Sequence, residues 1–142
     1  MSKEDQLVLA RTIYGEARGE SFLGKLAVGH VVLNRAQKKN KTITDICLQH
    51  SSKGTYQFTC WDPRDPNYEK IKDLQAGAGN EVFDQCFRAA AYAINQVTMD
   101  PTHGSTHYCT TDITPFWAVE DGKDITPAAI IGHHKFYNNI RW

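Results

Sequence analysis

The sequence lacks the features that mark several large classes of protein. Sixteen lysines and arginines balance sixteen aspartates and glutamates, so no net charge draws the chain to nucleic acid or to a membrane surface. No apolar run is long enough to span a bilayer. The N-terminal stretch MSKEDQLVLARTIYGEARGE has no apolar segment of the length that signal peptides contain. We therefore expect neither nucleic acid nor membrane as a partner.

The sequence also lacks the common motifs of metal, nucleophile and phosphate chemistry. Its four cysteines, at positions 47, 60, 86 and 109, are widely spaced and form no CxxC pair. Without a secretory signal, this spacing favours four free thiols over disulfides. There is no GxSxG turn, no HExxH helix and no glycine-rich phosphate loop after a strand. We expect no cofactor and no metal.

What the sequence does contain is a series of helical patterns before Met99. Apolar residues at helical spacing predict helices over residues 4–17, 21–39 and 80–97, and shorter ones from Thr44 and over 67–75. The remaining chain, rich in histidine, threonine and aromatic residues, predicts irregular structure with a few short strands. The 142 residues fit one domain, residues 1–142. The predicted fold is mainly α (α+β), with a small β portion.

Two glutamates, Glu16 and Glu20, stand four residues apart in the segment TIYGEARGE. On a helix they would share one face, with Cβ atoms about 5–6 Å apart, which overlaps the carboxylate separation of retaining glycosidases, about 5–5.5 Å. Two solvated charges at a helix end, weakened by Gly15 and Gly19, would show the same spacing. Apolar neighbours of Glu16 favour a raised pKa and proton donation near neutral pH. Spacing alone leaves both interpretations open.

The histidines suggest a different chemistry. His103 and His107 are four apart in HGSTH, and His134 lies downstream in GHHKFY. With Cys109 or Asp112 they could supply the ligands of a zinc ion. However, HGSTH lacks the glutamate of the HExxH helix, and its glycine, serine and threonine do not favour a helix.

The segment YQFTCW alternates aromatic and polar residues. Gln57 offers an amide to acetamido groups, and Tyr56 and Trp61 offer flat faces to sugars. A turn packed on the core, in which Phe58 and Trp61 simply bury apolar area, explains the same pattern equally well.

Six segments, taken in order, resemble the cell wall hydrolase family typified by the spore-cortex-lytic enzyme SleB and related phage endolysins. They run from about residue 8 to residue 137 and read IYGEARGE, GKLAVGHVVLNR, YQFTCW, DPTHGSTHY, FWA and IGHHKFY. The resemblance implies a lysozyme-like, mainly helical domain. It also implies cleavage of the glycan strand of peptidoglycan between N-acetylmuramic acid and N-acetylglucosamine.

The resemblance assigns roles to particular residues. The first glutamate of the GEARGE motif is the catalytic acid of the family, and it falls on Glu16. Glu20 is then expected to have a supporting role: to hold Arg18 or Arg35, to cap the backbone of a neighbouring segment, or to adjust the properties of Glu16. Tyr108 matches the tyrosine of the THY segment and is expected to contact the sugar or to orient Glu16.

Further residues match positions of the family pattern with less specific roles. Gln57, Phe58 and Thr59 match its QF-Ser/Thr segment and are expected to line the cleft, with threonine in place of serine. His107 and His134 also fall on family positions, which favours structural or cleft roles for them over zinc binding.

The resemblance leaves the reaction and its setting open. One acid serves both a muramidase and a lytic transglycosylase, and a zinc-dependent peptidoglycan amidase or peptidase and a non-catalytic peptidoglycan-binding module remain alternatives. The spore enzymes carry a secretion signal and a wall-binding domain, neither of which this sequence contains. We therefore expect a monomeric, phage-type endolysin, held in the host cytoplasm until it is released to the cell wall.

Overall fold

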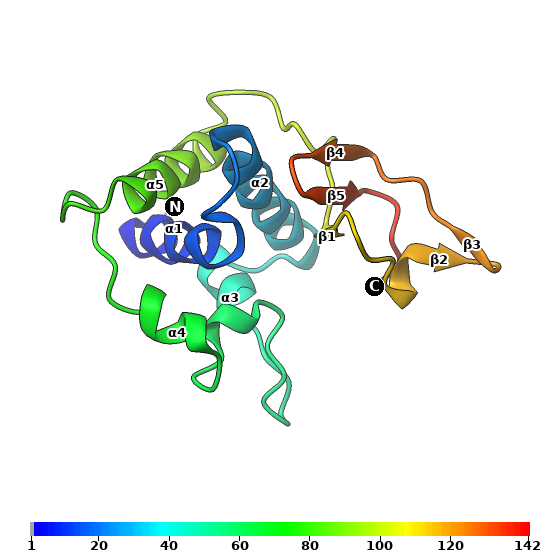
Figure 1. Cartoon of the computed structure of the whole chain (residues 1–142), viewed down its shortest axis with the longest axis horizontal. Helices are drawn as coiled ribbons and strands as arrows, with labels where there is room; N and C mark the ends of the chain where they lie inside the picture. Colours follow the sequence, from blue (N-terminus) through cyan, green and yellow to red (C-terminus); the bar gives the residue numbers. More distant parts are fainter. Residues whose placement is uncertain (1) are drawn as a thin grey trace.

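A computed structural model describes residues 2–142 and shows a helical part beside two small antiparallel sheets (Figure 1). The helices come first along the chain, and the strands follow after α5. The elements are α1 (Lys3–Ala17), α2 (Phe22–Lys39), α3 (Ile43–Leu48), the 3-10 turn η1 (Thr59–Trp61), α4 (Pro66–Ile71), α5 (Glu81–Ile94), β1 (His107–Thr110), the 3-10 turn η2 (Phe116–Ala118), β2 (Val119–Glu120), β3 (Lys123–Asp124), β4 (Ala129–Ile131) and β5 (His134–Tyr137).

The core lies where α1, α2 and α5 pack together (Figure 1). Close packing depends on small residues at the contacts. A Cβ atom added at Gly29 of α2 would lie 3.3 Å from both the Cβ atom of Ala93 and the Cδ1 atom of Ile13, so glycine lets α2 approach α5 and α1. Trp61 of η1 closes the core from one side, and its Nε1 donates a hydrogen bond to Thr12 Oγ1 at 2.9 Å.

Side-chain caps set the helix boundaries and explain where the predicted ranges differ. Ser2 forms a capping box with Asp5 at the start of α1, and Ser21 caps α2. Helix α3 begins at Ile43, one residue earlier than predicted, because the Thr42 hydroxyl accepts the Asp45 N–H. Helix α5 ends at Ile94 rather than near residue 97, because Asn95 caps it and Gln96 has a positive φ of 50°.

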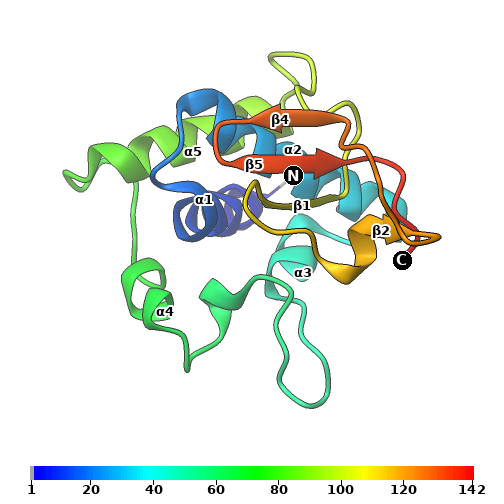
Figure 2. The same cartoon turned by 45° about the vertical axis from the view of Figure 1, so that its right-hand side comes forward.

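The main sheet has the strand order β1-β5-β4, with β5 in the centre and antiparallel to both neighbours. In Figure 2 this sheet lies in front of α2. Phe136 of β5 is fully buried against Ala27 and Val31 of α2, and this contact fixes the sheet to the helical part. A second ribbon, β2 with β3, extends beyond it (Figure 1). A mainly helical domain with a small antiparallel sheet confirms the predicted fold class.

All four cysteines are buried as free thiols. None of the helices within residues 2–142 is both long and apolar enough to cross a membrane.

Candidate active site

A groove of about 420 Å³ lies where the end of α1 meets the turn between β4 and β5. Glu16 sits in the last turn of α1 and lines this groove. One wall comes from the chain just after Glu16, and the opposite wall comes from the sheet. The lining residues are Gly15, Glu16, Ala17, Arg18, Gly19, Glu20, Thr110, His133 and His134.

Glu16 has the surroundings of a proton donor. Burial raises the pKa of its carboxyl group, although the hydrogen bond from Tyr108 and the positive charge of Arg35 oppose that shift. The Tyr108 hydroxyl donates a hydrogen bond to Oε1. Among the described residues, no hydrogen bond engages Oε2, so that oxygen is available to hold a proton.

Arg35 of α2 stands behind Glu16 and Tyr108. Its Nε donates a hydrogen bond to the Thr106 carbonyl at 2.5 Å, and its guanidinium lies over the Phe58 ring at 5.3 Å. Burial lowers the pKa of Arg35, while the neighbouring Tyr108 and Glu16 oppose that shift. A fixed cation at this position limits how far burial can raise the pKa of the acid.

The YQFTCW segment packs beside Glu16 but does not line this groove. A Cβ atom at Gly15 would overlap the side chain of Cys60, so glycine lets the η1 turn approach α1 next to the acid. Phe58 is buried in the core under Arg35, whereas Gln57 and Thr59 are exposed. We expected Gln57, Phe58 and Thr59 to line the cleft. None of the three is among the residues that line the groove around Glu16.

Glu20 holds the turn between β4 and β5. Its Oε1 accepts the backbone N–H of His133 at 2.8 Å, and its Oε2 lies 2.8 Å from His133 Nδ1. Burial disfavours its charge, but these bonds outweigh burial, so the pKa of Glu20 is lowered. A side chain at Gly132, where φ is +57°, would overlap Oε1. Glu20 therefore has one of its expected supporting roles, because it caps the backbone of the β4–β5 turn. Its ion pairs are with His133 and His134, not with an arginine.

His134 and Tyr108 meet on the face of the sheet that turns toward α1. Their rings contact edge to face at 5.1 Å, and His134 Nδ1 lies 3.8 Å from Glu20 Oε1. His134 is buried and lines the groove, and burial lowers its pKa although Glu20 opposes that shift. The His134 imidazole therefore lies between Glu20, which holds the β4–β5 turn, and Tyr108, which donates a hydrogen bond to Glu16.

His107 lies one residue before Tyr108 on β1 but packs elsewhere. Its ring contacts Trp117 and Trp142, each at 5.1 Å between ring centroids. Burial, together with the charges of Arg35 and two lysines of α2, lowers the pKa of His107 to about 4. These contacts are those of a structural residue. Of the two expected roles for His107, structural or cleft, these contacts favour the structural one.

The histidines of the zinc alternative do not come together. His103 is exposed in a turn, His107 packs among tryptophans and His134 faces Glu20. Within residues 2–142, no group of three or more histidine, cysteine, aspartate or glutamate side chains is placed to hold a metal ion.

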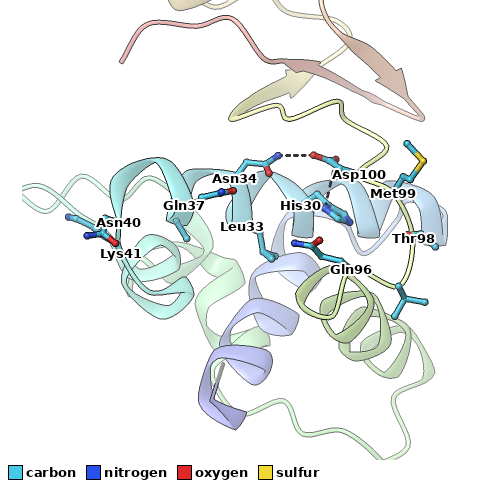
Figure 3. A pocket seen from close by; sticks show the side chains of 12 residues that line it. His30, Leu33, Asn34, Gln37, Asn40, Lys41, Gln96, Thr98, Met99 and Asp100 are labelled. Carbon is cyan, nitrogen blue, oxygen red and sulfur yellow. Dashed lines mark hydrogen bonds and ion pairs between the residues drawn. The ribbon is translucent and has the colours of Figure 1, made fainter.

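A larger hollow, of about 750 Å³, lies between α2 and the chain that follows α5 (Figure 3). Asp100 is its acidic residue, and hydrogen bonds from Asn34, Thr102 and Gly104 engage both carboxylate oxygens. Burial raises the pKa of Asp100, but these bonds outweigh it and lower the pKa overall. His30 is buried beside Asp100, with its Nδ1 atom 3.9 Å from Asp100 Oδ1. An ionised, fully bonded carboxylate is a poor proton donor, so this hollow is a weaker candidate than the groove at Glu16.

Comparison with known protein families decides what kind of enzyme this groove serves. The sequence pattern of the family described as "Cell Wall Hydrolase" matches residues 19–137. The chain belongs to the cell wall hydrolase family. The match begins at Gly19, so the assignment of Glu16 rests on its motif and on the geometry of the groove. No match was found among curated proteins.

Two solved structures share the fold of this cell wall hydrolase. One is described as the catalytic domain of the germination-specific lytic transglycosylase SleB from Bacillus anthracis; it is 26% identical, with a TM-score of 0.69 and 96% of both chains covered. The other is the catalytic domain of the Bacillus cereus SleB protein, at 23% identity and a TM-score of 0.66, covering 96% of this chain and 91% of that one. The hydrolase thus has a SleB-like catalytic fold.

Some residues of the hydrolase's groove were missed by sequence reasoning. Thr110 and His133 line it. Arg35 was expected only as a partner of Glu20, whereas its charge acts on Glu16. Residue type and spacing carried no signal for Thr110. For His133, the sequence signal was the histidine pair itself, which suggested zinc rather than a partner for Glu20. The signal for Arg35 was its place near the polar end of an otherwise apolar helix.

Proposed function

We propose that this cell wall hydrolase is a lytic transglycosylase that cleaves peptidoglycan between N-acetylmuramic acid and N-acetylglucosamine. The observation that carries the proposal is Glu16, a carboxyl group that lines the groove, has a raised pKa and accepts a hydrogen bond through only one of its oxygens. The catalytic role of Glu16 and the bond that is cleaved are parts of this proposal.

In the first step Glu16 acts as a general acid. Protonated Oε2 donates its proton to the oxygen that joins C1 of the muramic sugar to the next sugar, and the C1–O bond breaks. Tyr108 donates to Oε1 throughout, so the acid is oriented with its free oxygen toward the ligand. The raised pKa favours the protonated form that this step requires.

In the second step the same residue acts as a base. The 6-hydroxyl oxygen of the muramic sugar bonds to C1, and its proton passes to the Glu16 carboxylate, which restores the acid. The product is a 1,6-anhydro sugar, and water takes no part. One carboxyl group is enough for these two steps, whereas a retaining hydrolysis needs a second carboxylate as nucleophile.

The engagement of Glu20 favours transglycosylation over the retaining mechanism. Among the groove residues it is the other carboxylate, and both of its oxygens are held by His133. A nucleophile would have to leave these bonds and release the turn. The similarity to a solved domain described as a lytic transglycosylase supports the same choice.

The decisive experiment compares wild type with Glu16→Gln on purified peptidoglycan. We expect the variant to lose about 10²–10⁴-fold in rate, because an amide supplies no transferable proton and acid–base catalysis contributes about that much. Exposed Glu120 of β2 provides the control, Glu120→Gln. Mass spectrometry of the fragments should show ends that lack one water. Reducing ends instead would refute transglycosylation, and an active Glu16→Gln variant would refute the assignment of the acid.

The setting of the reaction is a separate part of the proposal. The resemblance of the motifs to phage endolysins supports an enzyme stored in the host cytoplasm and released to the wall when the inner membrane opens. Expression in a bacterial host should leave cells intact until a holin or chloroform opens the membrane. Lysis without such treatment would contradict this part and leave the chemistry untouched.

A further inference from the structure

Arg18 is the one guanidinium among the residues that line the groove around Glu16. It follows the last residue of α1, two positions after the acid. None of the ion pairs within residues 2–142 includes it. A residue with a permanent positive charge therefore lines the groove without an ion-pair partner within residues 2–142.

The guanidinium of Arg18 is held in place by neutral groups. Its Nη2 donates to Asn67 Oδ1 at 2.9 Å, its Nη1 donates to the Tyr14 carbonyl at 3.5 Å, and its Cζ atom lies 5.5 Å from the centre of the Tyr14 ring. Asn67 is itself fixed, because its backbone N–H donates to Asp65. Two of the five N–H donors are thus engaged and three stay available. A guanidinium oriented in this way loses little side-chain freedom when it binds an anion.

Neither carboxylate of the groove forms an ion pair with Arg18. Both oxygens of Glu20 face His133, and Glu16 must be neutral at the start of the proposed reaction. Asp65 acts on Glu16 and accepts the backbone N–H of Asn67, but it too forms no ion pair with Arg18 within residues 2–142. A ligand that brings a carboxylate to this point would gain a charge-assisted hydrogen bond, and guanidinium and carboxylate groups match in planar geometry.

The glycan backbone of peptidoglycan is neutral, but its muramic sugar carries a lactyl substituent. That substituent ends in a free carboxylate, or in a stem peptide with carboxylates of its own. We propose that Arg18 binds a carboxylate of the lactyl substituent or its peptide and so makes the enzyme prefer muramic strands to neutral N-acetylated glycans. The inference rests on the proposed function and names its specificity residue.

The contacts of Arg18 also allow a purely structural function, in which it only secures the end of α1. The two possibilities differ in one measurable respect. A structural residue matters equally for every substrate, whereas a carboxylate-binding residue matters only when the substrate carries the carboxylate.

The test measures binding in a Glu16→Gln background, so that strands stay uncut, and compares it with the double variant Glu16→Gln/Arg18→Gln. Three soluble strands serve as ligands: strands with stem peptides, strands stripped to the free lactyl group by an amidase, and stripped strands whose carboxylates are converted to methylamides. We expect Arg18→Gln to weaken binding about tenfold on a charged strand and to leave the methylamide strand unchanged. Arg18→Lys should restore part of the loss.

The outcome on each strand has a distinct meaning. A loss confined to stripped strands identifies the lactyl carboxylate, and a loss confined to peptide-bearing strands identifies a peptide carboxylate. An equal loss on all three, or no loss on any, overturns the inference. Thermal unfolding of Arg18→Gln shows whether an equal loss comes from a damaged fold. If wild type cuts none of the strands, the proposed reaction fails, but the binding comparison still decides the function of Arg18.

Discussion

Two residues from distant parts of the chain form the chemical centre of the groove. Tyr108 stands 92 positions after Glu16, and its hydroxyl binds the acid. The bond is stronger to the charged carboxylate than to the neutral acid, so it opposes the effect of burial. Burial and this bond together set the pH at which Glu16 holds its proton.

Replacing Tyr108 with phenylalanine should therefore move the pH dependence of cleavage. Without the hydroxyl, the pKa of Glu16 rises further, and the alkaline limb of kcat/KM should move up by about one pH unit, as expected for a hydrogen bond to a charged group. The measurement is the pH profile of peptidoglycan cleavage for wild type and Tyr108→Phe. Tyr92→Phe is a matched control, because Tyr92 lies on α5 and packs on Phe22. An alkaline limb that stays in place, or moves down, would contradict this account.

At the scale of elements, the groove needs the β4–β5 turn to stay beside the end of α1. Glu20, just beyond α1, binds the turn at His133, and glycine at position 132 makes room for the carboxylate. The two elements also share the wall formed by His134 and Thr110. The turn thus forms part of the site, and Glu20 acts on catalysis through it.

Removing the charge of Glu20 should weaken this connection. Because the pKa of Glu20 is lowered in the fold, its stabilisation is present above the unfolded pKa, about 4.3, and is lost as the pH falls through the lower folded value. At pH 7 we expect Glu20→Gln to reduce the free energy of unfolding by about 1 kcal/mol, the contribution of one hydrogen bond. Urea unfolding across this pH range measures it. A loss that persists unchanged below pH 3, or that Glu120→Gln reproduces, would exclude the mechanism.

The helices could be predicted from the sequence because their hydrogen bonds and caps are local. Ser2 and Ser21 lie within three residues of the N–H groups they accept. The partner of Glu20 could not be predicted in this way, since His133 lies 113 positions further along the chain. The same limit explains why the sequence left both a structural and a cleft role open for His107. Its sequence neighbour Tyr108 faces Glu16, but successive strand residues point to opposite faces.

For the whole molecule, the site lies between two packed parts. The end of α1 comes from the helical core, the opposite wall comes from the sheet, and α2 joins the two through Phe136 (Figure 2). Holding Glu16 at this junction takes a carboxyl group partly out of water. A site arranged for proton transfer is therefore expected to cost stability.

That cost should appear as a pH-dependent gain in stability when Glu16 is replaced by glutamine. Because burial raises the folded pKa of Glu16, the unfolded state releases its proton first as the pH rises from about 4.3. Wild type then loses about 1.4 kcal/mol relative to Glu16→Gln for each unit by which its folded pKa exceeds the unfolded one. Below the unfolded pKa both side chains are neutral, and the difference between the proteins should be constant. Urea unfolding of both proteins from pH 3 to pH 8 measures how this difference in the free energy of unfolding depends on pH, with Glu120→Gln as the control. Stability curves that stay parallel through this range would show that Glu16 does not hold its proton more tightly in the fold, and the acid step proposed for it would lose its physical basis.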